Sequence, residues 1–461
     1  MTLIKSISGI RGTIGGRSGQ GLTPLDIVKF TSAFATFIKN DLGKEKIKVV
    51  IGRDARISGE MVNNIVVGAL QGCGAEVIDL GLSTTPTVEI AVPRENADAG
   101  IILTASHNPK QWNALKLLNH RGEFISGSNG EEVLRLADSE EFSFSEVDDL
   151  GTYTQNKEYL QKHIQAVLDL DLVDVNAIKA SRFKVAIDAV NSTGGIFIPA
   201  LLEALGVKHV FKLFCEPNGE FPHNPEPLPE NLTAISEFIQ DQSADIGFVV
   251  DPDVDRLAMV CEDGSMFGEE YTLVAVADYI LSHTPGNTVS NLSSTRALRD
   301  VTEKHGGKYY ASAVGEVNVV NKMKEVNAII GGEGNGGIIY PASHYGRDSL
   351  VGVALFLSLL AKKKMKASKL RDSYPSYVIS KNKIQLTPEI DVDNILVNMA
   401  EKYKDENINT IDGVKIDFAS EWVHLRKSNT EPIIRIYAES SSKIDADRLA
   451  NRIIKEIEEL I

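Results

Sequence analysis

Three segments of the chain repeat one pattern: a β-branched run, a small-residue loop, an amphipathic helix and a second β run. The copies lie at residues 47–80, 183–213 and, more faintly, 288–311. This pattern is typical of a βαβ unit, in which a helix connects two parallel strands. The copies begin about 100 residues or more apart, so they indicate repeated domains and not the short period of a solenoid.

Beyond about residue 370 the pattern changes to alternating strands and two helical segments, the last near 444–461. A chain of 461 residues is also too long for one hydrophobic core. We therefore predict an α/β fold of three repeated domains with mixed, largely parallel sheets, followed by a C-terminal α+β domain, around a central cleft. The expected domains are residues 1–150, 151–258, 259–370 and 371–461.

The charge balance of the chain restricts its partners. With 63 acidic and 48 basic residues the net charge is −15, which opposes binding to nucleic acid or to an anionic membrane surface. No stretch resembles a signal peptide or a membrane span, and three scattered cysteines fit neither a disulfide framework nor a zinc site. We expect a cytoplasmic monomer or homodimer whose partner is a small molecule.

The first of four chemically suggestive loops contains Ser106. It follows the apolar run 101–103 and precedes Asn108-Pro109, so we expect a strand that ends in a turn with the hydroxyl near its tip. Such a hydroxyl is available for chemistry, although most serines in turns only bond the turn backbone. His107 and Lys116 offer a base or a positive charge, and this loop alone leaves both interpretations open.

The second loop carries Asp251, Asp253 and Asp255 after an apolar run that predicts a buried strand. A spacing of two directs all three carboxylates to one side of an extended chain. Carboxylates this close raise one another's pKa values unless a cation lies between them. Oxygen ligands without nearby Cys or His favour Mg²⁺ over zinc. The alternative is a solvated acidic turn that Arg256 closes.

The third loop, residues 331–337, is rich in glycine and joins two apolar runs. Glycines let a backbone approach a ligand closely, and Glu333 and Asn335 offer hydrogen bonds to sugar hydroxyls. A flexible hairpin explains the segment equally well. Its spacing is not that of a dinucleotide-binding fingerprint.

The fourth loop, residues 426–432 with Arg435 beyond it, concentrates cations and small polar groups within an acidic chain. Guanidinium groups hold phosphate bidentately, and hydroxyl and amide groups complete such a site. A polar hairpin turn is the alternative, but the local positive charge favours an anion.

Together the four loops resemble those of the α-D-phosphohexomutase family, which includes phosphoglucomutase, phosphomannomutase and phosphoglucosamine mutase. The resemblance covers the whole chain, and the loops stand in the family's order. It implies four domains around a central cleft, each contributing one loop. It also implies that Ser106 is a phosphoserine and that, with this serine, the three aspartates of the second loop hold one Mg²⁺ per chain.

The same resemblance assigns the remaining site residues. Catalytic roles near the transferring phosphoryl group fall to Arg11, Lys116 and His107. Substrate binding falls to the sugar-binding loop, the metal-loop arginine and the phosphate clamp: Glu333, Asn335, Arg256, Arg426, Ser428, Asn429, Thr430 and Arg435.

The implied reaction converts hexose 6-phosphate and hexose 1-phosphate into each other. PhosphoSer106 donates its phosphoryl group, a hexose 1,6-bisphosphate forms as intermediate and activator, and the other phosphate returns to Ser106 after reorientation. Positive charge from Mg²⁺, Arg11 or Lys116 offsets charge on the loose transition state. We expect Lys116 to act as acid or base if cationic surroundings lower its pKa.

One departure from the family concerns Gly337, where many members carry a His proposed as an acid or base. That role is either absent here or taken by Lys116 or His344. A structural role for His344 is the stronger alternative.

The sugar is a further open choice. The segment 104–109 and the start at 8–12 resemble phosphoglucosamine mutases, whereas 332–337 and 428–430 resemble phosphomannomutases and phosphoglucomutases. We favour glucosamine phosphate slightly, with glucose or mannose phosphate as the alternative. A metal-dependent phosphomonoesterase and a non-catalytic sugar-phosphate-binding protein are more distant possibilities.

Overall fold

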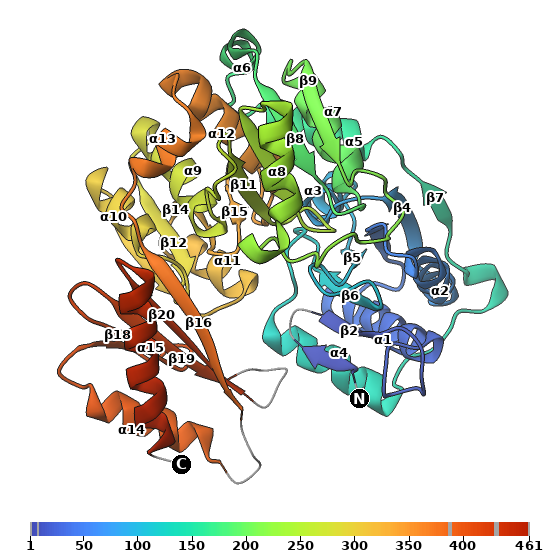
Figure 1. Ribbon diagram of the computed structural model, residues 1–461. Helices are drawn as coiled ribbons and strands as arrows, with labels where there is room; N and C mark the ends of the chain where they lie inside the picture. The colour runs from blue at the N-terminus through green and yellow to red at the C-terminus, as the bar shows by residue number, and fades with distance from the viewer. Residues whose placement is uncertain (1, 7–8, 386–389, 428–432, 460–461) are drawn as a thin grey trace.

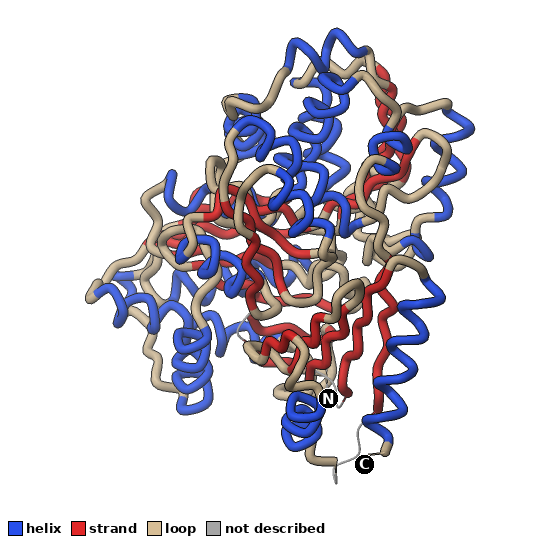
Figure 2. Tube along the Cα trace, turned by 90° about the vertical axis from the view of Figure 1, so that its left-hand side faces the viewer, coloured by secondary structure: helices blue, strands red, loops and turns tan. Residues whose placement is uncertain are grey.

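The computed structural model describes residues 2–6, 9–385, 390–427 and 433–459. Within these residues, four β-sheets follow one another along the chain and form an arc (Figure 1). The first domain lies at lower right in that view and the C-terminal domain at lower left. Helices flank the strands in Figure 2. The architecture confirms three α/β domains and a C-terminal α+β domain.

The first domain is a seven-stranded mixed sheet in the order β1-β2-β6-β5-β3-β4-β7. Apolar side chains of α1, α2 and α4 cover one face, and those of α3 cover the other. Its elements are β1 Ile4–Ser6, β2 Gly9–Thr13, α1 Pro24–Leu42, β3 Lys48–Arg53, α2 Gly59–Gly72, β4 Glu76–Leu82, α3 Thr85–Arg94, β5 Ala99–Leu103, β6 Trp112–Leu118, α4 Gly127–Ser139, η1 Val147–Asp149 and β7 Tyr153–Gln155.

The second domain is a four-stranded sheet in the order β11-β10-β8-β9, parallel except for β11. The buried strand and acidic loop expected after residue 246 are β10 and the turn to β11. Its elements are α5 Tyr159–Leu168, α6 Val175–Ser181, β8 Lys184–Asp188, α7 Gly194–Ala204, β9 His209–Leu213, η2 Pro229–Asn231, α8 Thr233–Gln242, β10 Ile246–Val250 and β11 Leu257–Cys261.

The third domain repeats this design with the order β13-β12-β14-β15, in which only β15 is antiparallel. Its elements are α9 Glu269–His283, β12 Asn287–Asn291, α10 Ala297–Lys304, β13 Tyr309–Ser312, α11 Glu316–Glu325, β14 Ala328–Glu333, β15 Gly337–Ile339, α12 Ser349–Lys363 and α13 Ala367–Asp372.

The C-terminal domain is an antiparallel sheet in the order β16-β20-β19-β18-β17, with two helices packed on it. Alternating apolar residues of β20 and the apolar stripe of the last helix form a core of their own. The elements are β16 Val378–Gln385, α14 Val392–Lys402, β17 Asn407–Asn409, β18 Val414–Asp417, β19 Trp422–Lys427, β20 Ile433–Ser440 and α15 Lys443–Glu458.

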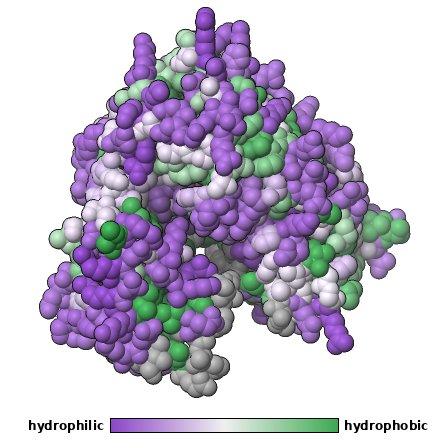
Figure 3. All heavy atoms as spheres, viewed as in Figure 1, coloured by the Kyte–Doolittle hydropathy of each residue, from purple (hydrophilic) through white to green (hydrophobic). Residues whose placement is uncertain are grey.

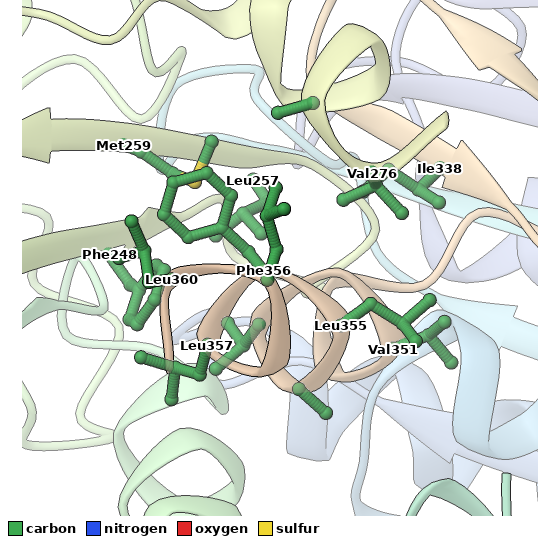
Figure 4. Packing of buried hydrophobic residues seen from close by; sticks show 14 of the residues in the cluster. Phe248, Leu257, Met259, Val276, Ile338, Val351, Leu355, Phe356, Leu357 and Leu360 are labelled. Carbon is green, nitrogen blue, oxygen red and sulfur yellow. The ribbon is translucent and has the colours of Figure 1, made fainter. Parts of the chain in front are cut away.

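Helix α12 joins the second and third domains in one continuous core. Thirteen of its fifteen residues are buried, so it is apolar on all sides, as a helix inside a core must be. Figure 4 shows Phe356 of α12 among side chains of both domains. Its ring lies edge-on to Phe248 at 6.3 Å and to Phe267 at 5.1 Å between centroids. This packing fixes the acidic loop relative to the glycine loop.

Three elements lie at or just beyond the predicted domain boundaries. Strand β7 pairs with β4 of the first sheet, β11 completes the second sheet, and α13 packs into the core of the third domain. The boundaries at 150, 258 and 370 stay predictions. The pairing partners lie far away in the chain, so the local pattern does not reveal them.

A hollow separates the C-terminal domain from the first domain in Figure 3, and mainly hydrophilic side chains surround it. Within the described part of the chain, no helix is both long and apolar enough to cross a membrane.

We expect Phe356→Ala to destabilise the second and third domains together, because it opens a cavity in their shared core. The free energy of unfolding should fall by about 3–5 kcal/mol. Urea unfolding followed by circular dichroism measures this change. Met365→Ala, at a residue that is 39% exposed, is the control and should shift the midpoint little. An unchanged midpoint in Phe356→Ala would contradict the shared core.

Candidate active site

Ser106 lies in the turn between β5 and β6. Its φ is +48°, a left-handed conformation that residues other than glycine rarely adopt. Its amide N–H donates to Thr104 Oγ1 at 3.0 Å. Its own Oγ donates to Asp251 Oδ2 of the second domain at 2.7 Å. The strained turn therefore directs the hydroxyl onto the acidic loop, as strained residues at functional sites commonly do.

Arg56 holds this turn from below. Its side chain is 1% exposed, and its Nε donates to Asp54 Oδ2 at 3.0 Å. The guanidinium also donates to four backbone carbonyls of the serine loop, those of Ser106, Asn108 (2.6 Å), Pro109 (2.7 Å) and Trp112 (3.1 Å). A planar group with five fixed donors suits this convergence of carbonyls, so Arg56 fixes the loop's shape.

Asp251, Asp253 and Asp255 converge as their spacing predicts. One oxygen from each lies within 4.8 Å of the others, and every side chain is at most 1% exposed. Burial, then repulsion from Asp255 and Asp253, raises the pKa of Asp251 well above its usual range. Oδ1 of Asp253 and Oδ1 of Asp255 have no hydrogen-bond partner among the described residues.

These donors fit a magnesium ion. Buried carboxylate oxygens without a partner are costly, and a divalent cation between them removes both the desolvation cost and the mutual repulsion. All donors are hard oxygens, and no His or Cys stands among this group, which favours Mg²⁺ over a softer metal.

Lys116 lies in anionic surroundings, which corrects the expectation that cations lower its pKa. Its Nζ is 2.7 Å from Asp253 Oδ2 and 3.4 Å from Asp255 Oδ2. Burial disfavours the ammonium, but Asp253 and Asp255 outweigh burial and raise the pKa of Lys116. Both carboxylates come from a loop more than a hundred positions away, so the sequence around Lys116 did not indicate them.

Arg347 connects the acidic loop to the sugar-binding loop. Its guanidinium donates to Asp255 Oδ2 at 2.6 Å, to Glu333 Oε2 at 2.7 Å and to Glu316 Oε2 at 2.9 Å. Burial opposes ionisation of Asp255, but Arg347 and then Lys116 hold the pKa of Asp255 below its usual range. Burial raises the pKa of Glu316 to about 7.

The Arg347 side chain also explains Gly337. A Cβ at residue 337 would lie 2.3 Å from Arg347 Cδ and 3.1 Å from Asn335 Oδ1. A His at this position would require Arg347 to move. Here the arginine fills the space beside the loop, and Asn335 accepts a hydrogen bond from the Gly337 amide at 3.2 Å.

Arg11 and Arg256 form the cationic side of the site, and His107 lies near them. Burial, then repulsion from Arg256, lowers the pKa of Arg11. Burial, followed by repulsion from Arg256 and Arg11, lowers the pKa of His107 well below its usual value. The His107 imidazole is therefore neutral at neutral pH. Positive charge concentrated in a buried place of this kind attracts an anionic ligand.

The phosphate clamp is described only in part. Ser428, Asn429 and Thr430 lie outside the described residues. Arg426 on β19 stands opposite Arg435 on β20, and its Nη1 lies 3.6 Å from Asp412 Oδ2. Among the described contacts, none joins Arg426 to the serine or aspartate loops. The structure thus brings together the predicted residues of the first three domains, with the arginine pair on a separate hairpin.

His344 lies between two carboxylates. Its Nε2 is 3.2 Å from Asp348 Oδ2, and its Nδ1 is 3.4 Å from Glu89 Oε2. Asp348 also caps the start of α12 by accepting from the amide of Leu350 at 2.8 Å. His344 therefore contacts the first domain through Glu89 and the third domain through Asp348.

Arg56 and Arg347 were missed by the sequence analysis. Each lies within two residues of an aspartate at one end of a loop: Arg56 in Asp54-Ala55-Arg56 directly after β3, and Arg347 in Arg347-Asp348 directly before α12. An arginine next to an aspartate where an apolar segment begins or ends is the one local signal that was present.

Four domain descriptions of one family match the chain. They are named phosphoglucomutase/phosphomannomutase alpha/beta/alpha domain I, domain II, domain III and C-terminal domain, and they match residues 3–144, 157–264, 268–377 and 386–456.

Relatives over nearly the full length carry mutase names. A phosphoglucomutase/phosphomannomutase of Thermococcus kodakarensis is 36% identical over 456 residues, with 98% of each chain covered. A phosphoglucosamine/phosphogalactosamine mutase of Sulfurisphaera tokodaii is 32% identical over 457 residues, again with 98% of each chain covered.

Solved structures with a similar fold carry mutase names as well. A phosphoglucomutase/phosphomannomutase family protein of Burkholderia thailandensis superimposes with a TM-score of 0.84 at 26% identity, covering 99% of this chain and 98% of the other. The N-acetylphosphoglucosamine mutase of Aspergillus fumigatus shares the fold at a TM-score of 0.59 and 13% identity, covering 98% and 95%. The chain therefore belongs to the phosphoglucomutase/phosphomannomutase family of α-D-phosphohexomutases and is a phosphosugar mutase.

Proposed function

We propose that this phosphohexomutase interconverts hexose 6-phosphate and hexose 1-phosphate through a phosphoserine at Ser106. The observation that carries the proposal is the 2.7 Å hydrogen bond from Ser106 Oγ to Asp251, the first of three buried aspartates. It puts a nucleophile beside a cluster of carboxylates that suits a divalent cation. A nucleophile and a divalent cation side by side suit phosphoryl transfer, because the cation offsets charge on the transferred group.

In the first half-reaction, a hydroxyl oxygen of the hexose phosphate attacks the phosphorus on Ser106. The bond from phosphorus to Ser106 Oγ breaks as the bond to the sugar oxygen forms, and the hydroxyl proton passes overall to Ser106 Oγ. After the hexose 1,6-bisphosphate has turned, the second half-reaction runs in reverse at its other phosphate. Ser106 is phosphorylated again, and the phosphate has changed position on the sugar.

Several residues of this chain stabilise the charge of the transferred phosphoryl group. Arg11 and Lys116 offset negative charge on the phosphoryl oxygens, and Arg347 holds the acidic loop in place through Asp255. Mg²⁺ held by Asp251, Asp253, Asp255 and the phosphoserine would supply positive charge beside the transferred group. The neutral His107 can accept a hydrogen bond or a proton close to Ser106.

Binding and orientation fall to the two later loops. Glu333 and Asn335 face a sugar, whereas Arg426 and Arg435, with Ser428, Asn429 and Thr430, bind the phosphate that is not being transferred. Arg256 is the last residue of the metal loop, and its Nη1 lies 3.7 Å from Glu226 Oε1. A clamp on the remote phosphate converts binding free energy into correct orientation of the reacting oxygen.

For the sugar we propose glucosamine 6-phosphate and glucosamine 1-phosphate. The serine loop supports this choice, and so does the name of the Sulfurisphaera tokodaii relative. Glucose or mannose phosphate is the second candidate, supported by the name of the Thermococcus kodakarensis relative. The bisphosphate would also act as an activator by phosphorylating Ser106 in enzyme that has lost its phosphate.

We expect Ser106→Ala to lower mutase turnover by at least about a thousandfold, because it removes the atom that carries the phosphoryl group. A coupled assay with glucosamine 1-phosphate measures this loss. Ser128→Ala, at an exposed serine of the same domain, should retain activity. Circular dichroism should show both variants folded, and unchanged turnover in folded Ser106→Ala would refute the phosphoserine route.

We expect exhaustive dialysis against EDTA to abolish activity and added Mg²⁺ to restore it, because three buried carboxylates need a compensating cation. Initial rates before and after dialysis measure the effect. Dialysis against EDTA saturated with Mg²⁺ is the control. Full activity after chelation would show that the aspartates serve a different purpose.

Comparison of kcat/KM on glucosamine, glucose and mannose 1-phosphates tests the sugar. We expect glucosamine 1-phosphate to be preferred by about tenfold or more, since a site built around a 2-amino group is less well matched by the 2-hydroxyl of glucose or mannose. Equal or higher values for glucose or mannose 1-phosphate would replace our assignment with the alternative.

A further inference from the structure

A polar cavity of about 230 Å³ lies between the third domain and the C-terminal domain. It lies between β13 and β17, which are the edge strands of their sheets. Its lining comprises Leu292, Ser294, Arg296, Arg299, Tyr309, Ala311, Asn407, Ile408, Asn409, Lys415 and Asp417. None of these residues belongs to the serine, aspartate, sugar-binding or clamp loops.

Three cations and one carboxylate line this cavity. Arg296 is 5% exposed and Lys415 is 6% exposed, while Arg299 is half-buried. Asp417 is the only acidic residue in the lining. The lining therefore carries an excess of positive charge, and an anion in the cavity would offset it.

The Arg296 guanidinium is not saturated. Nη1 donates to the Ala419 carbonyl at 3.4 Å, but Nε and Nη2 have no hydrogen-bond partner in the described residues. Glu439 forms an ion pair with Nε and Asp417 forms one with Nη2, each at 3.5 Å but out of hydrogen-bond geometry, so the N–H groups stay open while their charge is partly offset. A buried guanidinium with open N–H groups is suited to an oxyanion, which it can bind through two oxygens.

Lys415 reaches the cavity from β18 of the C-terminal domain. Its Nζ lies 4.2 Å from the centre of the Trp422 ring, and no carboxylate of the described residues lies within ion-pair distance. Burial lowers the pKa of Lys415 to about 8, so the ammonium still predominates at neutral pH. An anion in the cavity would meet Arg296 and Arg299 on one side and Lys415 on the other.

We propose that this cavity binds a small phosphate dianion, free or as the head of a small phosphate ester, and ties the C-terminal domain to the third domain. Water can fill part of the space, which corresponds to about eight molecules at roughly 30 Å³ each, but water does not offset the net charge. A phosphate group does, and it also supplies acceptors for the open N–H groups.

The cavity also contacts the sugar-binding loop. Ser294 lines it, and Ser294 Oγ accepts a hydrogen bond from the Gly334 amide at 3.0 Å. Two hydrogen bonds join the third domain to the C-terminal domain. Ser293 Oγ lies 2.9 Å from His424 Nδ1, and the Val314 amide donates to Asp412 Oδ2 at 2.9 Å. A bound dianion would therefore influence how the C-terminal hairpin approaches the sugar-binding loop.

Equilibrium dialysis of the full chain with radiolabelled inorganic phosphate tests the proposal. Wild type and the control Lys404→Met, at an exposed lysine of the same domain, should bind the same number of equivalents. Lys415→Met and Arg299→Met should each lose one equivalent or bind it at least tenfold more weakly. Arg299→Met keeps the test valid if Lys415→Met fails to fold, because Arg299 is only half-buried.

Equal binding by all folded variants would overturn the proposal. If the Lys415-dependent equivalent is found, competition with unlabelled glycerol 3-phosphate shows whether the site takes a phosphate ester or free phosphate. Release of the Lys415-dependent equivalent by the ester identifies a site for phosphate esters, whereas retention identifies a site for free phosphate.

Discussion

The acidic loop of the second domain depends on charges from its neighbours, and the arrangement of the site follows from that dependence. Lys116 of the first domain and Arg347 of the third domain both reach Asp255, at 3.4 and 2.6 Å. Without these cations, carboxylates so close and so deeply buried would not remain ionised together. The same contacts align three domains, because each partner of the loop comes from a different one.

Much of the fold and part of the site followed from local sequence patterns. The strand ends at Ser106 and Asp251 were predictable because an apolar run followed by polar turn residues is a local signal. The contact between Ser106 and Asp251 was not predictable, since it depends on how the sheets of the first and second domains pack. Lys116 shows the limit most clearly, because its expected cationic neighbours proved to be carboxylates distant in the chain. Arg56 was missed for a related reason. Its partners are backbone carbonyls, which every residue carries, so the sequence does not show which of them bind an arginine.

Gly337 and Arg347 show how one position limits another. The arginine stem lies where a side chain on residue 337 would have to go, and its guanidinium is held by three carboxylates. A larger residue at 337 therefore requires a different partner for Asp255 and Glu333. In this chain a fixed positive charge therefore lies beside the sugar-binding loop, where many members of the family carry a His.

The core around α12 has a mechanical consequence. Separating the second domain from the third would expose a buried apolar helix to water, so these two domains behave as one rigid body. The C-terminal domain has its own core, and its described contacts with the third domain include hydrogen bonds, such as that between Ser293 and His424, and the buried ion pair of Arg296 with Glu439. Polar contacts exchange for water at little net cost. Separating the C-terminal domain from the third domain therefore exposes less apolar surface than separating the second from the third, and it leaves the serine and its aspartates in place.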